Sequence, residues 1–197
     1  MPPAVVTVWF DYACPHSYLG LGQLEELAST LGFDIDRRPF LVRSDSLEKG
    51  HSPRDLENRE RDGSKRRPLY KPGEGLVIEP ASNRSVSTLA VQAATAYAKE
   101  RGLDGRFYWA ASKEYWEQGT DLGSLYTLRR LAVSVGLDWG KMWPNLDSGD
   151  YHKLVLAQHE AAKETGVVRA PSFRIGGKLH SGPMDAEELR ATVQVAK

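Results

Sequence analysis

Apolar and polar residues alternate in some parts of this chain, which predicts strands. In other parts the apolar residues recur at helical spacing, which predicts helices. A continuous β-branched and aromatic run at residues 5–10 has the length and composition of a buried strand. Leucines at helical spacing follow it, and Gly32 is placed to end that helix. Residues 33–36 then alternate apolar and polar side chains, as a half-buried strand does. The N-terminal part therefore predicts a strand, a helix and a second strand.

The middle of the chain has the longer period of amphipathic helices. Four stretches carry an apolar face and end close to a glycine, at residues 89–97, 107–115, 125–135 and 154–165. Before them, residues 41–82 combine charge runs with prolines and glycines, which predicts a short polar helix and a long loop. The basic triplet at residues 65–67 is typical of a solvated surface, although it could bind an anionic partner.

The strand pattern returns near the C-terminus. Residues 172–175 alternate as a strand, two glycines predict a hairpin turn, and residues 178–181 form the returning strand. Asp185 followed by Glu188 resembles the capping box of a last helix. Strand and helix units at both ends, with helices between them, predict an α/β fold that contains an all-helical insertion.

Composition and charge narrow the function classes. A chain of 197 residues that is 41% hydrophobic is long enough for one domain, or for a domain with a large insertion. Its 26 basic and 26 acidic residues balance, which argues against a nucleic-acid or polyanion binder. No apolar run approaches the roughly 20 residues of a membrane span, and no signal peptide precedes the first strand. A single cysteine suits a reducing compartment, so the cytoplasm is the expected location.

That single cysteine, Cys14, stands where the first strand becomes the first helix. Pro15 fits the first helical position, because its missing N–H has no intrahelical partner there. Cys14 is then the expected N-cap, where free N–H groups and the helix dipole favour a thiolate. His16 adds a cationic or hydrogen-bonding neighbour, so the pattern predicts an ionised, nucleophilic thiol near neutral pH. The alternative is a small buried hydrophobe, the commoner fate of a free cysteine.

The helical stretches carry two further groups of candidate functional residues, aromatic side chains and a pair of histidines. The aromatic residues have the spacing of a buried face, and one or two of them are expected to line a groove at the domain junction; they are Tyr108, Trp109, Tyr115, Trp116, Trp139 and Trp143. His152 and His159 lie two helical turns apart, which is not the i, i+4 spacing of a metal-binding pair. No metal site is therefore assigned.

Two motifs carry a family resemblance. Residues 10–20, Phe-Asp-Tyr-Ala-Cys-Pro-His-Ser-Tyr-Leu-Gly, resemble the active-site segment of the DsbA-like thioredoxin superfamily, in particular its FrnE-like branch. The 2-hydroxychromene-2-carboxylate isomerases and kappa-class glutathione transferases are related to that branch. Residues 166–177, followed by Ser181 and Gly182, are similar to the family's cis-proline loop, strand and hairpin. The resemblance covers essentially the whole chain.

The resemblance implies both a domain organisation and an active site. Residues 1–40 and 150–197 would form a thioredoxin-like domain, and residues 41–149 a helical insertion. Cys14 would be the nucleophile, and His16 and Ser17 would stabilise its thiolate. Pro171 would be a cis-proline beside the sulfur, and the backbone of Ala170 would pair with a peptide or with glutathione. From the residues alone, a trans proline that opens a strand is the ordinary expectation.

Two positions depart from the family pattern. Ser17 replaces the resolving cysteine of the dithiol members, so a mixed disulfide on Cys14 needs an external thiol such as glutathione to release it. Ser17 can still donate a hydrogen bond to the thiolate. Arg169 and Ala170 stand where relatives tend to have a small pair such as Gly-Val. Arg169 either points at the site, where its charge favours the thiolate, or points out as a solvated strand-end residue.

Glutathione is the expected co-substrate, and no tightly bound cofactor is implied. Its γ-glutamyl end is held near the start of the last helix in the glutathione-using relatives, which corresponds here to residues 181–185. A helix N-terminus binds anions, but a plain helix cap is an equally good interpretation. The expected substrate or glutathione contacts are Pro15, Arg169, Ala170, Ser181, Gly182, Met184 and Asp185.

Three functions follow from these observations. The leading hypothesis is a cytoplasmic thiol-disulfide oxidoreductase or isomerase of the FrnE-like branch that uses Cys14 and glutathione. The second is a glutathione-dependent isomerase or transferase acting on an aromatic small molecule, although those relatives usually carry Ser-Pro-Tyr-Ser in place of Cys-Pro-His-Ser. The third is a non-catalytic peptide-binding module. Partners would be glutathione or protein thiols and disulfides, with the choice between monomer and homodimer left open.

Overall fold

The computed structural model describes residues 4–42 and 88–196. The polar stretch expected to form a short helix and a loop falls almost entirely in the gap between these ranges, as does the basic triplet at residues 65–67. Both expectations, including the anionic partner, lie outside the described residues.

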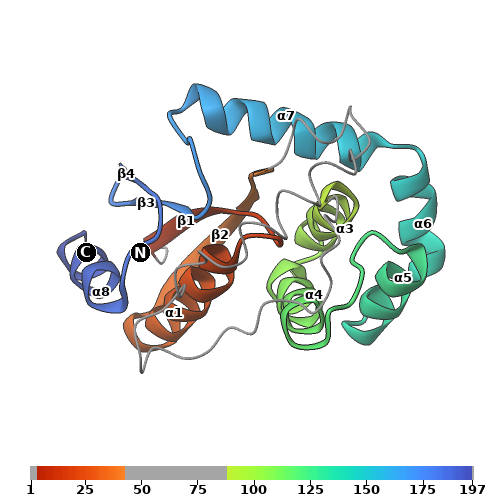
Figure 1. Ribbon diagram of the computed structural model, residues 1–197, viewed down its shortest axis with the longest axis horizontal. Coiled ribbons are helices and arrows are strands. Elements are labelled where there is room, and N and C mark those ends of the chain that lie inside the picture. The colour runs from red at the N-terminus through yellow and green to blue at the C-terminus, as the bar shows by residue number, and fades with distance from the viewer. Residues whose placement is uncertain (1–3, 43–87, 197) are drawn as a thin grey trace, which may run out of the picture.

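A mixed four-stranded sheet organises the fold (Figure 1). Its order is β2-β1-β3-β4, with β1 parallel to β2 and the other neighbouring pairs antiparallel. The strand β1 has a neighbour on both sides, as its continuous apolar run predicts. The strands are β1 (Ala4–Phe10), β2 (Phe33–Pro39), β3 (Ser172–Ile175) and β4 (Lys178–Ser181).

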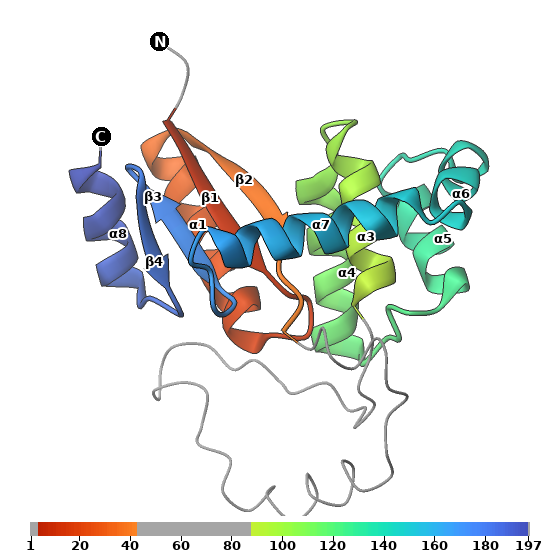
Figure 2. The same ribbon diagram turned by 90° about the horizontal axis from the view of Figure 1, so that it is seen from above.

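Helices cover both faces of this sheet. The helices α1 (Pro15–Leu31) and α8 (Ala186–Val195) pack below it in the view of Figure 1, and α7 (Asp150–Glu164) crosses the other face (Figure 2). Alternate residues of β1 serve the two sides, because Val8 lies in the main core whereas Trp9 packs with Ala162 of α7. None of the described helices has the length and apolar character that a membrane span requires.

The remaining helices form the all-helical segment between β2 and α7. They are α3 (Leu89–Lys99), α4 (Asp104–Gln118), α5 (Leu125–Ser134) and α6 (Trp139–Asp147). Three of them match predicted helices, and α7 begins four residues before the predicted start at residue 154. The prediction missed α6, because this nine-residue helix contains Pro144 and has only Met142 and Leu146 buried. Its N-cap is Asp138, whose side chain accepts a hydrogen bond from the Lys141 N–H.

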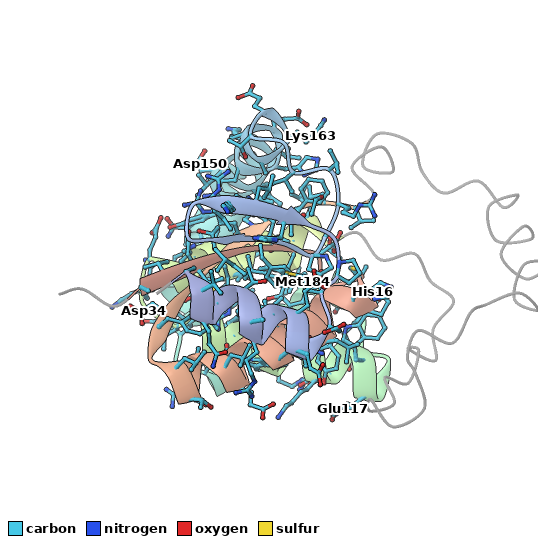
Figure 3. All side chains as sticks on the ribbon, turned by 90° about the vertical axis from the view of Figure 1, so that its left-hand side faces the viewer. His16, Asp34, Glu117, Asp150, Lys163 and Met184 are labelled. Carbon is cyan, nitrogen blue, oxygen red and sulfur yellow. The ribbon has the colours of Figure 1, made fainter. Side chains whose placement is uncertain are left out.

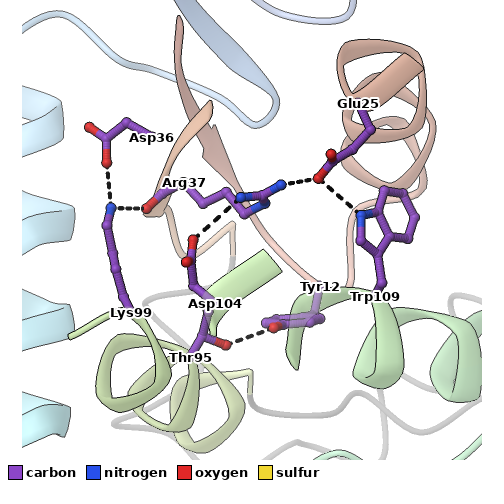
Figure 4. Close-up of polar contacts among 8 residues, drawn as sticks. All are labelled: Tyr12, Glu25, Asp36, Arg37, Thr95, Lys99, Asp104 and Trp109. Carbon is purple, nitrogen blue, oxygen red and sulfur yellow. Dashed lines mark hydrogen bonds and ion pairs between the residues drawn. The ribbon is translucent and has the colours of Figure 1, made fainter. Parts of the chain in front are cut away.

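Buried polar contacts join the sheet to the helical segment (Figure 4). Arg37 of β2 forms ion pairs with Glu25 of α1 and with Asp104 of α4, and its side chain is only 9% exposed. The hydroxyl of Tyr12 hydrogen-bonds to Thr95 of α3 at 2.7 Å. These contacts join the helical segment to β2, to α1 and to the turn after β1 that leads into the candidate site.

Candidate active site

Cys14 is the N-cap residue of α1, as the sequence predicts. Its backbone is extended, with φ −96° and ψ 113°, and Pro15 occupies the first turn behind it. The N–H groups of Ser17 and Tyr18 donate to the Cys14 carbonyl at 3.0 and 3.2 Å, which starts the helix. The thiol itself is half-buried at this helix end.

The second predicted motif meets this cysteine in space. The Cys14 thiol donates a hydrogen bond to the carbonyl oxygen of Ala170, with Sγ and oxygen 3.3 Å apart. The peptide bond between Ala170 and Pro171 is cis, as the resemblance implies. Cys14 also packs against a small apolar cluster that includes Trp9 and Ala170. The two ends of the chain therefore build one site.

Close packing of α1 holds the loop around Pro171 in place. Gly20 lies so near that a Cβ atom there would stand 3.1 Å from Cζ of Phe173 and 3.6 Å from Cγ of Pro171. On the other side, the Gly182 N–H donates to the Pro171 carbonyl at 3.0 Å. The hydroxyl of Ser172 donates to the Arg169 carbonyl at 2.7 Å. The Ala170 carbonyl is thus presented to the sulfur by a constrained loop.

The protonation state of Cys14 differs from the prediction. Burial raises the pKa of the Cys14 thiol above its ordinary value, and the nearby Asp11 carboxylate acts in the same direction. Hydrogen bonds from Ser17 and from the His16 backbone lower that pKa without offsetting the burial. The expected thiolate at neutral pH is therefore wrong for the free protein, in which the thiol donates to Ala170. The helix N-cap position alone does not compensate for lost hydration.

Asp11 is a site residue that the sequence reasoning missed. It is 3% exposed, and its Oδ1 and Oδ2 accept hydrogen bonds from the N–H groups of Ala13 and Val42 at 3.0 and 2.7 Å. Its own N–H donates to the Ser17 hydroxyl at 3.3 Å. An acidic residue directly after a buried strand and three positions before the cysteine was the available signal. Asp11 shapes the turn that carries Cys14 and adds a negative charge beside it.

The two other residues of the Cys-Pro-His-Ser motif take different positions. Ser17 is fully buried beneath the cysteine, and its hydrogen bonds favour the thiolate, as predicted. His16 is half-buried on the first turn of α1 (Figure 3), and the part of it that acts on the sulfur is its backbone N–H. The motif therefore stabilises a thiolate through short-range donors from the helix start.

Arg169 runs along the outside of the site. Its side chain is exposed and crosses Gly182, where a Cβ atom would stand 3.2 Å from Cδ of Arg169. Gly182 has φ +106°, a backbone conformation that favours glycine. The guanidinium of Arg169 therefore lies beside the connection between β4 and α8.

The residues that lead into α8 lie next to the Pro171 loop, and their side chains have different contacts. Ser181 is exposed, and its hydroxyl oxygen lies 3.4 Å from that of Ser172. Met184 is 8% exposed and belongs to the main core (Figure 3), so its side chain serves packing. Asp185 caps α8, because its Oδ1 accepts the Glu188 N–H at 2.8 Å, which confirms the predicted cap.

Aromatic side chains border the site where α1 meets α4. Tyr18, one turn after the cysteine, stacks on Trp116 with ring centroids 5.9 Å apart and meets Trp109 edge to face. Trp116 is buried, whereas Trp109 and Tyr18 are half-buried. The prediction that most aromatic residues here are core is confirmed for Tyr108 and Tyr115 as well.

His159 has a structural contact within the described part of the chain. It is 3% exposed, and its Nδ1 accepts the Leu41 N–H at 3.1 Å. Among residues 4–42 and 88–196, no group of three or more His, Cys, Asp or Glu side chains could hold a metal ion.

Known structures share this architecture. A probable DsbA oxidoreductase from Streptomyces coelicolor aligns with a TM-score of 0.69 and 22% identity, over 98% of this chain and 89% of that one. A 2-hydroxychromene-2-carboxylate isomerase aligns with a TM-score of 0.71 and 20% identity, over 97% and 93% of the two chains. The cytosolic disulfide reductase DsbM from Pseudomonas aeruginosa, solved with GSH, aligns with a TM-score of 0.63 and 14% identity, over 98% and 95%. At these identities the likeness shows the fold.

The sequence itself matches a family model. Residues 5–194 match the DSBA-like thioredoxin domain, so the match spans both predicted motifs and the helical segment between them. With the strand order, the cysteine at the N-cap of α1 and the adjoining proline loop, the chain belongs to the family of DSBA-like thioredoxin domains.

Proposed function

We propose that this protein is a cytoplasmic thiol-disulfide oxidoreductase or isomerase of the FrnE-like branch that works through the single nucleophile Cys14 with glutathione as co-substrate. The observation that carries the proposal is the half-buried thiol at the N-cap of α1, 3.3 Å from the Ala170 carbonyl. A sulfur placed there meets a disulfide from the solvent side while the neighbouring loop offers backbone for the ligand to pair with.

The monothiol motif determines the reaction sequence. The Cys14 thiol loses its proton to solvent, and the thiolate attacks one sulfur of a disulfide. A new bond forms to Cys14, the old S–S bond breaks, and the departing thiolate takes up a proton. Ser17 has no thiol with which to resolve this mixed disulfide. A glutathione thiolate attacks the ligand sulfur of the mixed disulfide instead, which releases Cys14 as a thiolate and leaves the ligand in a new disulfide with glutathione.

Charged groups beside the loop suit the two ends of a γ-glutamyl group. The exposed guanidinium of Arg169 offers planar recognition of a carboxylate. Asp185, Glu187 and Glu188 already supply negative charge to the first turn of α8. That helix start therefore favours the ammonium of a γ-glutamyl group. Pro15 and Ala170 would contact the part of the ligand nearest the sulfur.

Two further observations support the cytoplasmic, glutathione-dependent assignment. The one cysteine cannot form an internal disulfide, which suits a reducing compartment. DsbM, one of the structural neighbours, is described as cytosolic and was solved with GSH. The proposal needs no metal and no tightly bound cofactor, since exchange between thiols and disulfides balances without either.

Intact mass measurement after incubation with oxidised glutathione tests the proposal. The wild-type protein should gain one glutathione moiety, and the gain should disappear on later addition of reduced glutathione. The Cys14→Ser variant is the control and should show no change in mass. A wild-type protein that gains no mass while its thiol remains free would contradict the proposal and favour a peptide-binding module with an incidental cysteine.

A second function is favoured by one specific contact. Tyr18 lies one helical turn after the cysteine. Its ring stacks on Trp116 and also meets Trp109 edge to face. An aromatic surface this close to a thiol site suits a glutathione-dependent isomerase or transferase with an aromatic substrate. The Cys14→Ser variant separates the two functions, because it abolishes disulfide exchange but leaves glutathione-assisted isomerisation largely intact.

A further inference from the structure

The resting site holds its nucleophile in the unreactive form. The Cys14 S–H donates to the Ala170 carbonyl oxygen, and the lone pairs of that oxygen would face a sulfur anion 3.3 Å away. The buried Asp11 carboxylate places a second negative group near the sulfur. Both contacts favour the thiol, yet the attacking species in disulfide exchange is the thiolate. A ligand that weakens either contact would raise the thiolate fraction and with it the rate of exchange.

Burial is the largest cause that raises the pKa of Cys14, and two neighbouring groups also disfavour the thiolate. Of these two groups, Asp11 is poorly placed to respond to a ligand. It is 3% exposed, and both carboxylate oxygens accept backbone N–H groups from Ala13 and Val42. Ala170 lies in the loop before β3, and its carbonyl touches the sulfur that a ligand must reach. The Ala170 carbonyl is therefore the group that an incoming ligand meets together with Cys14.

A cysteine-containing ligand brings a suitable donor to that carbonyl. Its own backbone N–H is separated from its sulfur by two carbon atoms, so a ligand sulfur in line with Cys14 carries an N–H into the same small region. A carbonyl oxygen has two lone pairs, and an N–H is a stronger donor than an S–H. Pairing with the ligand N–H therefore weakens the S–H contact, and the positive end of the N–H dipole offsets the repulsion between the carbonyl oxygen and a thiolate.

We infer that the Ala170 carbonyl keeps Cys14 protonated until the cysteinyl N–H of the ligand takes over that carbonyl, so that binding of a glutathionyl or peptidyl ligand itself generates the nucleophile. The inference rests on the proposed function and adds its regulation. The proton leaves Cys14 for solvent, the S–S bond to the ligand then forms as described above, and no further reactant is needed. The free protein thereby stays resistant to alkylation and oxidation.

A titration of the thiolate by ultraviolet absorbance tests this inference on the full-length protein. It is recorded for the free protein and at saturating S-methylglutathione, which carries the cysteinyl N–H but cannot exchange disulfides. The Cys14→Ser variant supplies the background signal of the tyrosines. Replacement of the Cys14 S–H contact to Ala170 by the ligand N–H should raise the thiolate population at neutral pH about two- to tenfold, as expected for one hydrogen bond.

A matched ligand identifies the group responsible. S-methylglutathione that is also methylated on the cysteinyl nitrogen lacks the N–H and should leave the thiolate population within about twofold of its value in the free protein. Binding of both ligands is measured separately by calorimetry. The inference is overturned if S-methylglutathione binds without changing the thiolate population of Cys14. It is also overturned if the N-methylated ligand changes that population equally. In both cases the proposed function stands. If S-methylglutathione does not bind at all, the glutathione-dependent function fails and the inference fails with it.

Discussion

The sulfur of Cys14 donates a hydrogen bond to the carbonyl oxygen of Ala170 across 156 positions of sequence, with 3.3 Å between the two atoms. This contact brings the start of α1 and the loop before β3 into one site. The contact suits a neutral thiol, and burial also raises the pKa of Cys14. The reactivity of the site therefore depends on the groups around the Cys14 sulfur that favour either the thiol or the thiolate.

Substitutions of Asp11 and Ser17, the two side chains that act on the sulfur, should shift the pKa of Cys14 in opposite directions. Asp11→Asn removes the negative charge that raises the pKa of Cys14, so this pKa should fall. Ser17→Ala removes the side-chain hydrogen bond that lowers the same pKa, which should rise. The measurement is the rate of iodoacetamide alkylation as a function of pH, with circular dichroism to show that both variants are folded. Shifts in the same direction for both variants would refute this description of the site.

Two glycines of α1 should respond differently to alanine. In a helix interior, alanine is more favourable than glycine by about 0.5–1 kcal/mol. Gly22→Ala should show this gain, because its Cβ would stand 3.7 Å from Trp109, an ordinary contact. Gly20→Ala should instead lose about 1–3 kcal/mol through overpacking, since its Cβ would stand 3.1 Å from Phe173. Urea unfolding measures both changes, and equal stability of the two variants would contradict the close approach of α1 to the Pro171 loop.

The ion pairs of Arg37 should matter more than those at the surface. Arg37→Met leaves Glu25 and Asp104 without their shared cation in a largely buried place, and should cost about 2–4 kcal/mol of unfolding free energy. Lys153→Met is the control, because Lys153 pairs with Asp150 at the surface, where the two side chains are 77% and 74% exposed and loss of the pair should be undetectable. Denaturant midpoints of the two variants provide the comparison. A wild-type midpoint for Arg37→Met would show that the junction does not depend on this arginine.

His159 should make the protein less stable in acid. Burial lowers the pKa of His159 below its ordinary value of 6.5. The unfolded chain therefore binds the proton more readily, so the stability that His159 contributes is complete above pH 6.5 and is lost as the pH falls below it. His159→Asn keeps an acceptor for the Leu41 N–H without a titrating group, and its unfolding free energy should decline less between neutral and mildly acidic pH. Part of the decline should remain, because burial also lowers the pKa of His152.

Local patterns were sufficient to predict most of the fold. The strand β1, the helix start at Pro15, the end of α1 at Gly32 and the cap at Asp185 each depend on a few neighbouring residues. The helix α6 was missed because Pro144 and the small number of buried side chains weaken its pattern. In the site, the meeting of two distant motifs was predictable only through the family resemblance.

The protonation state of Cys14 could not be predicted in the same way. The helix position and the motif favour a thiolate, and those signals are present in the sequence. Burial of the sulfur and the nearby charge of Asp11 oppose it, and both arise from packing between elements. The direction of the pKa therefore depends on a balance of local and tertiary effects, of which the sequence displays the local part.

The most direct test is catalytic turnover of a glutathionylated peptide with reduced glutathione, followed by NADPH consumption through glutathione reductase. The wild-type protein should accelerate the release of the peptide thiol, and Cys14→Ser should reduce the rate to that of the uncatalysed reaction. A Cys14→Ser variant as active as the wild type, or a folded wild-type protein that adds nothing to the uncatalysed rate, would contradict the proposal that Cys14 is the nucleophile of a glutathione-dependent disulfide exchange.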